Sequence, residues 1–168
     1  MKIWEIIMLK SMSWFKISII SITTITVFMV IIFRLILNRG IICGTCMEPT
    51  YHNGDTHLSW NQAYLFTKPK KLDVVVLRFP NQKRISMKRI VALENETVKF
   101  RNGKLIIDDR EVNEEYVKYP CNWEISAVKI SRDNVFVVGD NRSEHVEYKE
   151  RGIFWEVPIK NIIGKVIQ

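Results

Sequence analysis

The sequence predicts a mostly β domain that follows a single N-terminal transmembrane helix. Three observations support this fold class. Residues 17–33 form an apolar stretch without charge, short runs rich in Val, Ile and Phe follow Gly40, and no long amphipathic helical period appears after residue 40. The 168 residues, 47% of them hydrophobic, suffice for about one packed domain. We therefore predict an anchor over 1–39 and a β domain over 40–168.

The apolar stretch reads ISIISITTITVFMVIIF and spans 17 residues. At a rise of about 1.5 Å per residue, this is close to the minimum for crossing about 30 Å of hydrocarbon. Apolar neighbours on both sides, with Lys16 and Arg34 reaching the headgroups, extend the expected helix to about 14–37. A buried core helix is the alternative, but the flanking positive charges favour a membrane span.

We expect this helix to remain as an uncleaved anchor. A cleaved signal peptide has small residues just past its apolar region, whereas residues 34–42 read RLILNRGII and the first alanine is Ala63. Three basic residues precede the apolar stretch and two follow it, which slightly favours a cytoplasmic N-terminus. The predicted location is the plasma membrane, with a single pass and an extracytoplasmic C-terminal domain.

The positive charge of the chain is concentrated around the anchor. The net charge is +7, and residues 1–39 contribute +4 of it, with five basic residues against one acidic residue. This distribution favours contact with a lipid bilayer over nucleic-acid binding, so no nucleic-acid partner is expected.

After Gly40 the pattern is that of short strands separated by turns. Asn102-Gly103 is a strong hairpin-turn signal, and Asp108-Asp109 is a weaker one. The candidate strands are 73–79, 97–100, 104–108, 127–130 and 134–139.

The segment CGTCMEPT, residues 43–50, allows three interpretations. A redox CxxC motif opens a helix, but Pro49 disfavours helix here and no βαβ pattern surrounds it. A zinc site needs two more ligands, and the spacing of His52 and His57 fits no common structural finger. The third interpretation is that one cysteine is a nucleophile. Three cysteines are too few for a disulfide scaffold, and neither a metal nor a cofactor is expected.

The third interpretation is supported by a resemblance. GTCMEPT resembles the G-x-S-M-x-P-T box of type I signal peptidases, the bacterial leader peptidases with a Ser/Lys dyad, and Cys46 stands where they have the nucleophilic serine. ISMKRIVALENETV resembles the box that contains their general-base lysine, which places Lys88 on that lysine and Arg89 after it.

Further boxes follow in the same order, so that the resemblance covers nearly everything after Gly40. KKLDVVVLRFP, NGKLIIDDREVNEEYV and VPIKNIIGKVI resemble other family segments, and NVFVVGDNR resembles the F-F-V-x-G-D-N-R box. The implied fold is a signal-peptidase-like antiparallel β domain on one anchor. The implied supporting residues are Arg89, Gly139, Asp140, Asn141 and Arg142, and the implied substrate-binding residues are Gly44, Met47, Pro49 and Met87.

The resemblance implies hydrolysis of signal peptides on exported proteins, after small residues at the −1 and −3 positions. Cys46 would attack, its backbone N–H would help to hold the oxyanion, and Lys88 would move protons. A free lysine titrates near ~10.4, so this role requires an apolar setting, which Ile85, Met87 and Ile90 can supply. A thiol titrates near ~8.5 and is already a better nucleophile than a hydroxyl.

The chain departs from the family pattern after Asn141. His145 replaces the serine that orients the lysine, and the residues at 147–149 also differ. A Cys46–His145 pair would be a conventional thiol and base, whereas the alternative is a surface histidine in a charged loop. A Cys43–Cys46 disulfide that blocks the nucleophile is a further hypothesis.

Two functions therefore remain open. The first is a membrane-anchored signal peptidase-like endopeptidase that uses a Cys/Lys variant of the dyad and acts on exported preproteins. The alternative is a family member without catalysis that binds surface-protein subunits such as pilins and assists their assembly. Apolar residues near the site, Met47, Trp60 and Phe79, face either the lipid or the core.

Overall fold

The computed structural model describes residues 3–61, 63–80, 83–143 and 156–167. The chain divides into two compact units, 1–37 and 38–168, and each is described on its own.

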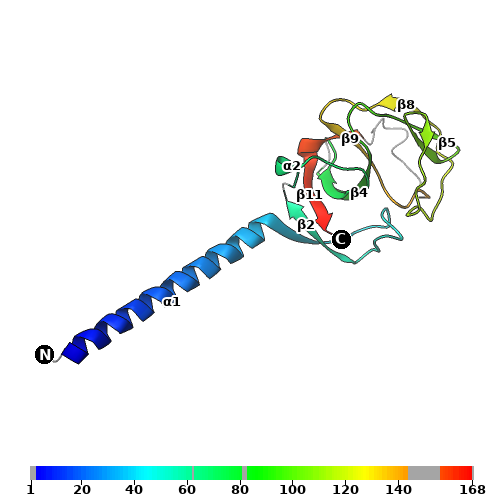
Figure 1. The fold of residues 1–168 in the computed structure, drawn as a ribbon. Coiled ribbons are helices and arrows are strands. Elements are labelled where there is room, and N and C mark those ends of the chain that lie inside the picture. Colours follow the sequence, from blue (N-terminus) through cyan, green and yellow to red (C-terminus); the bar gives the residue numbers. More distant parts are fainter. Residues whose placement is uncertain (1–2, 62, 81–82, 144–155, 168) are drawn as a thin grey trace. The chain divides into compact units, whose positions relative to one another are not determined.

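The first unit is one long helix, α1 (Ile3–Ile36) (Figure 1). Its segment Trp14–Ile36 is long and apolar enough to cross a membrane, and none of it is buried within the chain. Hydroxyl groups inside this segment donate hydrogen bonds to the preceding turn, for example Thr26 Oγ1 to the Ile22 carbonyl at 2.9 Å. Such internal satisfaction suits polar side chains in an apolar medium.

The second unit consists of two antiparallel sheets, which confirms the predicted fold class (Figure 1). The larger sheet has seven strands in the order β1 (Leu37–Ile41), β2 (Thr56–Asn61), β11 (Ile162–Ile167), β3 (Val74–Arg78), β4 (Ile85–Ala92), β9 (Asn134–Val138) and β10 (Glu156–Pro158). The smaller sheet has four strands in the order β7 (Arg110–Glu111), β6 (Lys104–Ile107), β5 (Thr97–Arg101) and β8 (Ile125–Lys129). A short helix α2 (Ala63–Phe66) and a 3-10 turn η1 (Ile159–Asn161) complete the described elements.

The predicted β runs correspond to β3, β5, β6, β8 and β9. Both turn signals also form hairpins with positive φ angles: 48° and 75° at Asn102 and Gly103, and 48° and 63° at Asp108 and Asp109. The edge strand β1 and its neighbour β2 were not predicted, because LNRGI and THLSWN lack a clear apolar alternation. Pairing within the sheet, rather than local propensity, makes these two segments extended.

Strand β3 separates two parts of the core, since successive side chains of a strand point to opposite faces. Val75 and Leu77 pack in one cluster with Ile90 of β4, whereas Val74 and Val76 pack in another. This second cluster also contains Met47 and Met87, and Cys46 packs against it. A third cluster joins the smaller sheet to β4 and β9, with Phe100 and Trp123 in an edge-to-face contact at 5.4 Å between centroids. Burial on both faces explains the continuous VVVL run.

We expect Gly103→Ala to destabilise the β domain more than Gly54→Ala. Both glycines have positive φ, 75° and 93°, so both substitutions incur backbone strain of about 1–2 kcal/mol. A methyl group at Gly103 would lie only 1.8 Å from the Cys121 carbonyl oxygen, whereas nothing lies within 4 Å at Gly54. The clash should add about 1–3 kcal/mol to the loss in free energy of unfolding. Urea unfolding of the full chain in detergent measures both variants, and equal losses would contradict the close approach.

Candidate active site

Cys46 lies in a compact loop between β1 and β2. Met47 has no exposed surface and fixes the loop to the core. The loop is closed at its base by hydrogen bonds between the backbones of Ile42 and two residues of the following turn: Ile42 N–H to Asp55 O, and Gly54 N–H to Ile42 O, both at 2.8 Å. Cys46 is therefore held by a buried neighbour on one side and a closed loop base on the other.

Lys88 comes from β4, and its amine approaches the Cys46 loop at Gly139. A Cβ atom added at Gly139 would lie 2.3 Å from the Cys46 carbonyl oxygen and 3.4 Å from Lys88 Nζ. The Cys46 sulfur in turn lies 3.7 Å from the carbonyl oxygen of Met87, the residue before Lys88. A side chain at position 139 would overlap the Cys46 carbonyl, so only glycine fits there. The end of β9, the Cys46 loop and β4 therefore approach one another at this residue.

Cys46 and Lys88 line one pocket of about 630 Å³. Of the four predicted substrate-binding residues, Gly44 and Met87 line this pocket, whereas Met47 and Pro49 do not. Met47 is buried in the core, so its side chain offers no surface for a substrate; this corrects its predicted placement. Phe79 lines the pocket but is 7% exposed, which favours core over lipid, and Trp60 is half-buried.

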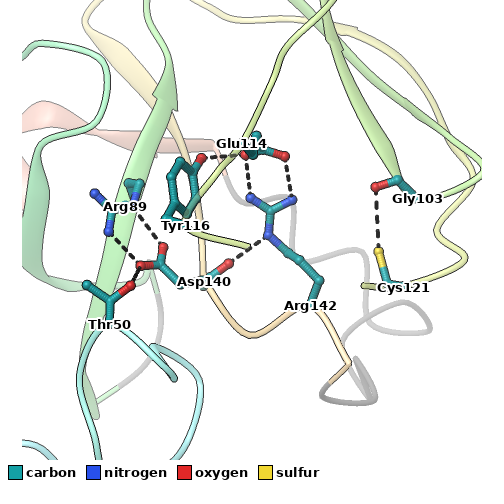
Figure 2. Close-up of polar contacts among 9 residues, drawn as sticks. Thr50, Arg89, Gly103, Glu114, Tyr116, Cys121, Asp140 and Arg142 are labelled. Atoms are coloured by element: carbon teal, nitrogen blue, oxygen red, sulfur yellow. Dashed lines mark hydrogen bonds and ion pairs between the residues drawn. The ribbon is translucent and has the colours of Figure 1, made fainter. Parts of the chain in front are cut away.

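A buried ion pair connects the strand of Lys88 to the loop of Cys46 (Figure 2). Arg89 Nε donates to Asp140 Oδ1 at 2.8 Å and Arg89 Nη2 donates to Oδ2 at 2.5 Å. The hydroxyl of Thr50 donates to the same Oδ2 at 2.5 Å, and Arg89 Nη1 donates to the Leu72 carbonyl at 3.0 Å. Asp140 is fully buried, so its charge is matched inside the protein rather than by water.

A second buried arginine supports the same turn from the other side. Arg142 donates to Glu114 from Nη1 at 3.0 Å and from Nη2 at 2.6 Å, and its Nε donates to the Gly139 carbonyl at 2.7 Å. The hydroxyl of Tyr116 also donates to Glu114. Figure 2 shows the Tyr116 ring between the two arginines, and Arg89 stacks on it at 4.3 Å. The two ion pairs thus form one supported unit.

Asn141 links this unit directly to the Cys46 loop. Its backbone N–H donates to the Cys46 carbonyl and its side-chain amide donates to the Thr45 carbonyl, both at 3.1 Å. The structure therefore brings together the predicted supporting residues Arg89, Gly139, Asp140, Asn141 and Arg142 around the backbone of Cys46.

The charge states of this unit follow from its surroundings. Burial alone would lower the pKa of Arg89, but its hydrogen bond and charge interaction with Asp140 prevail and raise that pKa. Burial raises the pKa of Tyr116, and the neighbouring Glu114 carboxylate raises it further. Arg89 is therefore a cation and Tyr116 a neutral phenol at neutral pH, as their hydrogen bonds require.

Several site residues were not singled out from the sequence. Glu114 and Tyr116 lie within NGKLIIDDREVNEEYV, where the family box itself contains an E-x-Y signal. His57, considered from the sequence only as a zinc ligand, and Trp123, which comes from a distant segment, also line the pocket. Burial lowers the pKa of His57, and its Nδ1 has no hydrogen-bond partner among the described residues.

The cysteines and His145 complete the inventory of predicted groups. Cys43, Cys46 and Cys121 are free, so the structure does not form the hypothesised Cys43–Cys46 disulfide. Within the described ranges, no group of three or more His, Cys, Asp or Glu residues could hold a metal ion. His145 lies outside the described residues, so its pairing with Cys46 stays a prediction.

Comparisons with known proteins agree with the boxes quoted above. Residues 12–168 match the family model described as "Signal peptidase, peptidase S26". Thylakoidal processing peptidase 1 of Arabidopsis thaliana is 31% identical over 137 residues, which cover 75% of this chain and 39% of the relative. Signal peptidase I P of Bacillus subtilis subsp. natto is 29% identical over 163 residues, covering 90% of this chain and 84% of the relative.

A cyanobacterial relative and a solved structure are also similar. Probable signal peptidase I-1 of a Synechocystis strain is 30% identical over 129 residues, covering 72% of this chain and 64% of the relative. The crystal structure of a signal peptidase I from Enterococcus faecalis has a TM-score of 0.49 and 22% identity, covering 61% of this chain and 98% of that chain. The match spans less than two thirds of the plant and cyanobacterial relatives.

We expect Asp140→Asn to destabilise the β domain by about 3 kcal/mol or more, because it leaves the buried Arg89 charge uncompensated. The matched control is Asp109→Asn, which removes an equally short ion pair with Lys99 on the surface, where Asp109 is 87% exposed. Water already screens that pair, so the control should unfold like the parent chain. Urea denaturation compares the two, and similar midpoints for both variants would contradict the role given to Asp140.

Proposed function

The chain belongs to the signal peptidase family, peptidase S26, and on this premise we propose that it is a membrane-anchored endopeptidase that removes signal peptides from exported proteins. The observation that supports the proposal best is the meeting of the Cys46 loop and the Lys88 amine at Gly139, within one pocket. A nucleophile and a base in reach of one bound peptide are the minimum that acyl transfer requires.

In the proposed reaction, the Cys46 thiol gives its proton to the Lys88 amine, and the sulfur attacks the carbonyl carbon of the scissile peptide bond. The backbone N–H of Cys46 donates to the resulting oxyanion. The C–N bond then breaks, the leaving amine takes up a proton from Lys88, and a thioester with Cys46 remains. A water molecule that gives its proton to the neutral Lys88 amine hydrolyses this thioester and frees the thiol. The chemistry needs no metal or cofactor.

Lys88 lies at the boundary between the core and the pocket. Lys88 is half-buried, its β4 neighbours Met87 and Ile90 lie in the core, and no described Asp or Glu lines the pocket with it. A Cys46 thiol is less dependent on this base during attack than a serine would be, because thiolate forms more readily.

The proposed substrate lies extended between β1 and the beginning of β4. The pocket lining includes residues 38–43, of the edge strand and the loop after it, and residues 84–88. Extended peptides bind such edges through main-chain hydrogen bonds, and side-chain pockets then select small residues at −1 and −3. The apolar helix α1 would hold the enzyme in the plasma membrane with a single pass and the β domain on the extracytoplasmic side.

A second candidate is a binding protein without turnover, which would hold surface-protein subunits such as pilins during assembly. The replacement of serine by Cys46 and the altered residues after Asn141 favour this alternative. It would keep the pocket and the peptide-binding edges but would not release a cleaved product.

Cleavage of a preprotein with a small-x-small site distinguishes the two candidates. We expect Cys46→Ala and Lys88→Met to lower kcat by at least roughly 10³-fold, because each removes a reacting group. Cys46→Ser should retain cleavage but lose sensitivity to a small thiol reagent. Cys121→Ala is the matched control, since Cys121 lies outside the pocket lining. Failure of both the parent chain and Cys46→Ser to cleave would favour the binding protein.

His145→Ala tests whether this histidine takes part in the reaction. If His145 serves as a base for Cys46, the variant should lose about 10²-fold or more in kcat, and its pH–rate profile should lose a limb near the ordinary histidine pKa. Lys149→Ala, a neighbour in the same charged segment, is the control. Unchanged turnover and an unchanged pH profile would assign His145 to the surface and leave Lys88 as the base.

A further inference from the structure

The Lys, Arg, Asp and Glu side chains that line the pocket are all basic. Arg39, Arg84 and Lys88 line it together with His57, and no Asp or Glu of the described residues does so. A cleft lined by charges of one sign concentrates ligands of the opposite sign. A peptide that enters this pocket therefore meets a positive potential, which favours acidic side chains in the peptide.

Arg39 and Arg84 differ from the other arginines of the site in having no partner. Arg89 and Arg142 are buried and form ion pairs with Asp140 and Glu114. Arg39 and Arg84, by contrast, are exposed, and their guanidinium groups form no hydrogen bond or ion pair with any of the described residues. A guanidinium group presents a planar fork of donors that matches a carboxylate. These two groups are thus available to a ligand in the pocket.

The position of Arg84 along its segment sets the distance from the reacting groups. Arg84 precedes Lys88 by four residues and directly precedes β4, whereas Arg39 lies on β1, seven residues before Cys46. At about 3.3 Å per residue, four residues of extended chain span about 13 Å. An extended peptide with its scissile bond beside Lys88 would bring a side chain about three to five residues away to the position of Arg84.

We propose that Arg39 and Arg84 form a carboxylate-binding subsite that selects peptides with Asp or Glu about three to five residues from the cleavage site. The subsite disfavours Lys or Arg at the same place, since three cations already line the pocket. This inference deepens the proposed function, on which it rests for the position of the peptide. The main chain and the small residues would place the scissile bond, and the two arginines would choose among substrates that satisfy that requirement.

An anionic lipid headgroup offers the same chemistry, but the placement favours a peptide. Both arginines line the same pocket as Cys46 and Lys88, together with apolar and small residues that suit an extended chain: Gly40, Gly44, Val76, Ile85 and Met87. A site for a headgroup alone would not need to share its cavity with the nucleophile.

The test uses the full chain in nanodiscs of neutral phosphatidylcholine and a set of peptides with one small-x-small site. The peptides differ only by Glu, Gln or Lys at each position three to five residues on either side of the scissile bond. We expect Glu to exceed Lys in kcat/KM by about tenfold at one of these positions. Arg84→Gln and Arg39→Gln should each reduce this preference with little change for the Gln peptide, and Arg84→Glu should reverse it.

Arg132→Gln is the matched control, because Arg132 is an exposed arginine outside the pocket lining.

Binding of the same peptides to Cys46→Ala, measured by fluorescence anisotropy, separates this inference from the proposed function. A Glu preference in binding without any cleavage by the parent chain would support the subsite and refute the peptidase. Equal kcat/KM and equal affinity for the Glu and Lys peptides at all positions would overturn the subsite. Loss of binding to phosphatidylglycerol nanodiscs in Arg39→Gln and Arg84→Gln, without peptide selectivity, would assign the arginines to lipid and likewise overturn it.

Discussion

The buried ion pair between Arg89 and Asp140 is the interaction on which the site depends. Arg89 follows Lys88 on β4, and Asp140 follows Gly139 at the end of β9, so their pairing fixes these two strand segments to each other. Thr50 joins the same carboxylate from the nucleophile loop. Because both charges lie away from water, neither can leave the pair without a large cost in free energy. The pair thereby limits the loop and the base to one arrangement.

Close packing at Gly139 holds the Cys46 loop next to the strand of Lys88. The Cys46 carbonyl approaches the Gly139 backbone more closely than any side chain there would permit, and the Lys88 amine lies beside the same position. Asn141 then satisfies the backbone carbonyls of the loop, which would otherwise be left without donors next to the pocket. These tertiary contacts fix the backbones of Cys46 and Lys88, while the Cys46 thiol and the Lys88 amine remain at the surface of the pocket.

The four arginines of this region fall into two pairs with different surroundings. Arg89 and Arg142 are buried, paired with carboxylates and stacked on aromatic rings, so they serve the fold. Arg39 and Arg84 are exposed in the pocket lining, where an unpaired guanidinium group interacts with whatever occupies the cleft. Burial and pairing, not residue type, distinguish the two roles. The same distinction applies to the apolar residues of the loop, where Met47 belongs to the core and its neighbour Cys46 reaches the pocket.

The sequence by itself determined the helix, the hairpins and the family. A long uncharged stretch, apolar β runs and the Asn102-Gly103 turn are local signals, and the ordered boxes identify Cys46, Lys88 and Asp140 without coordinates. Only the tertiary structure decided that β1 and β2 are strands, that Met47 is core, and that His57, Trp123 and the unpaired Arg39 and Arg84 share the pocket. The physical reason is that pairing between distant strands and burial depend on neighbours far along the chain, which no local pattern records.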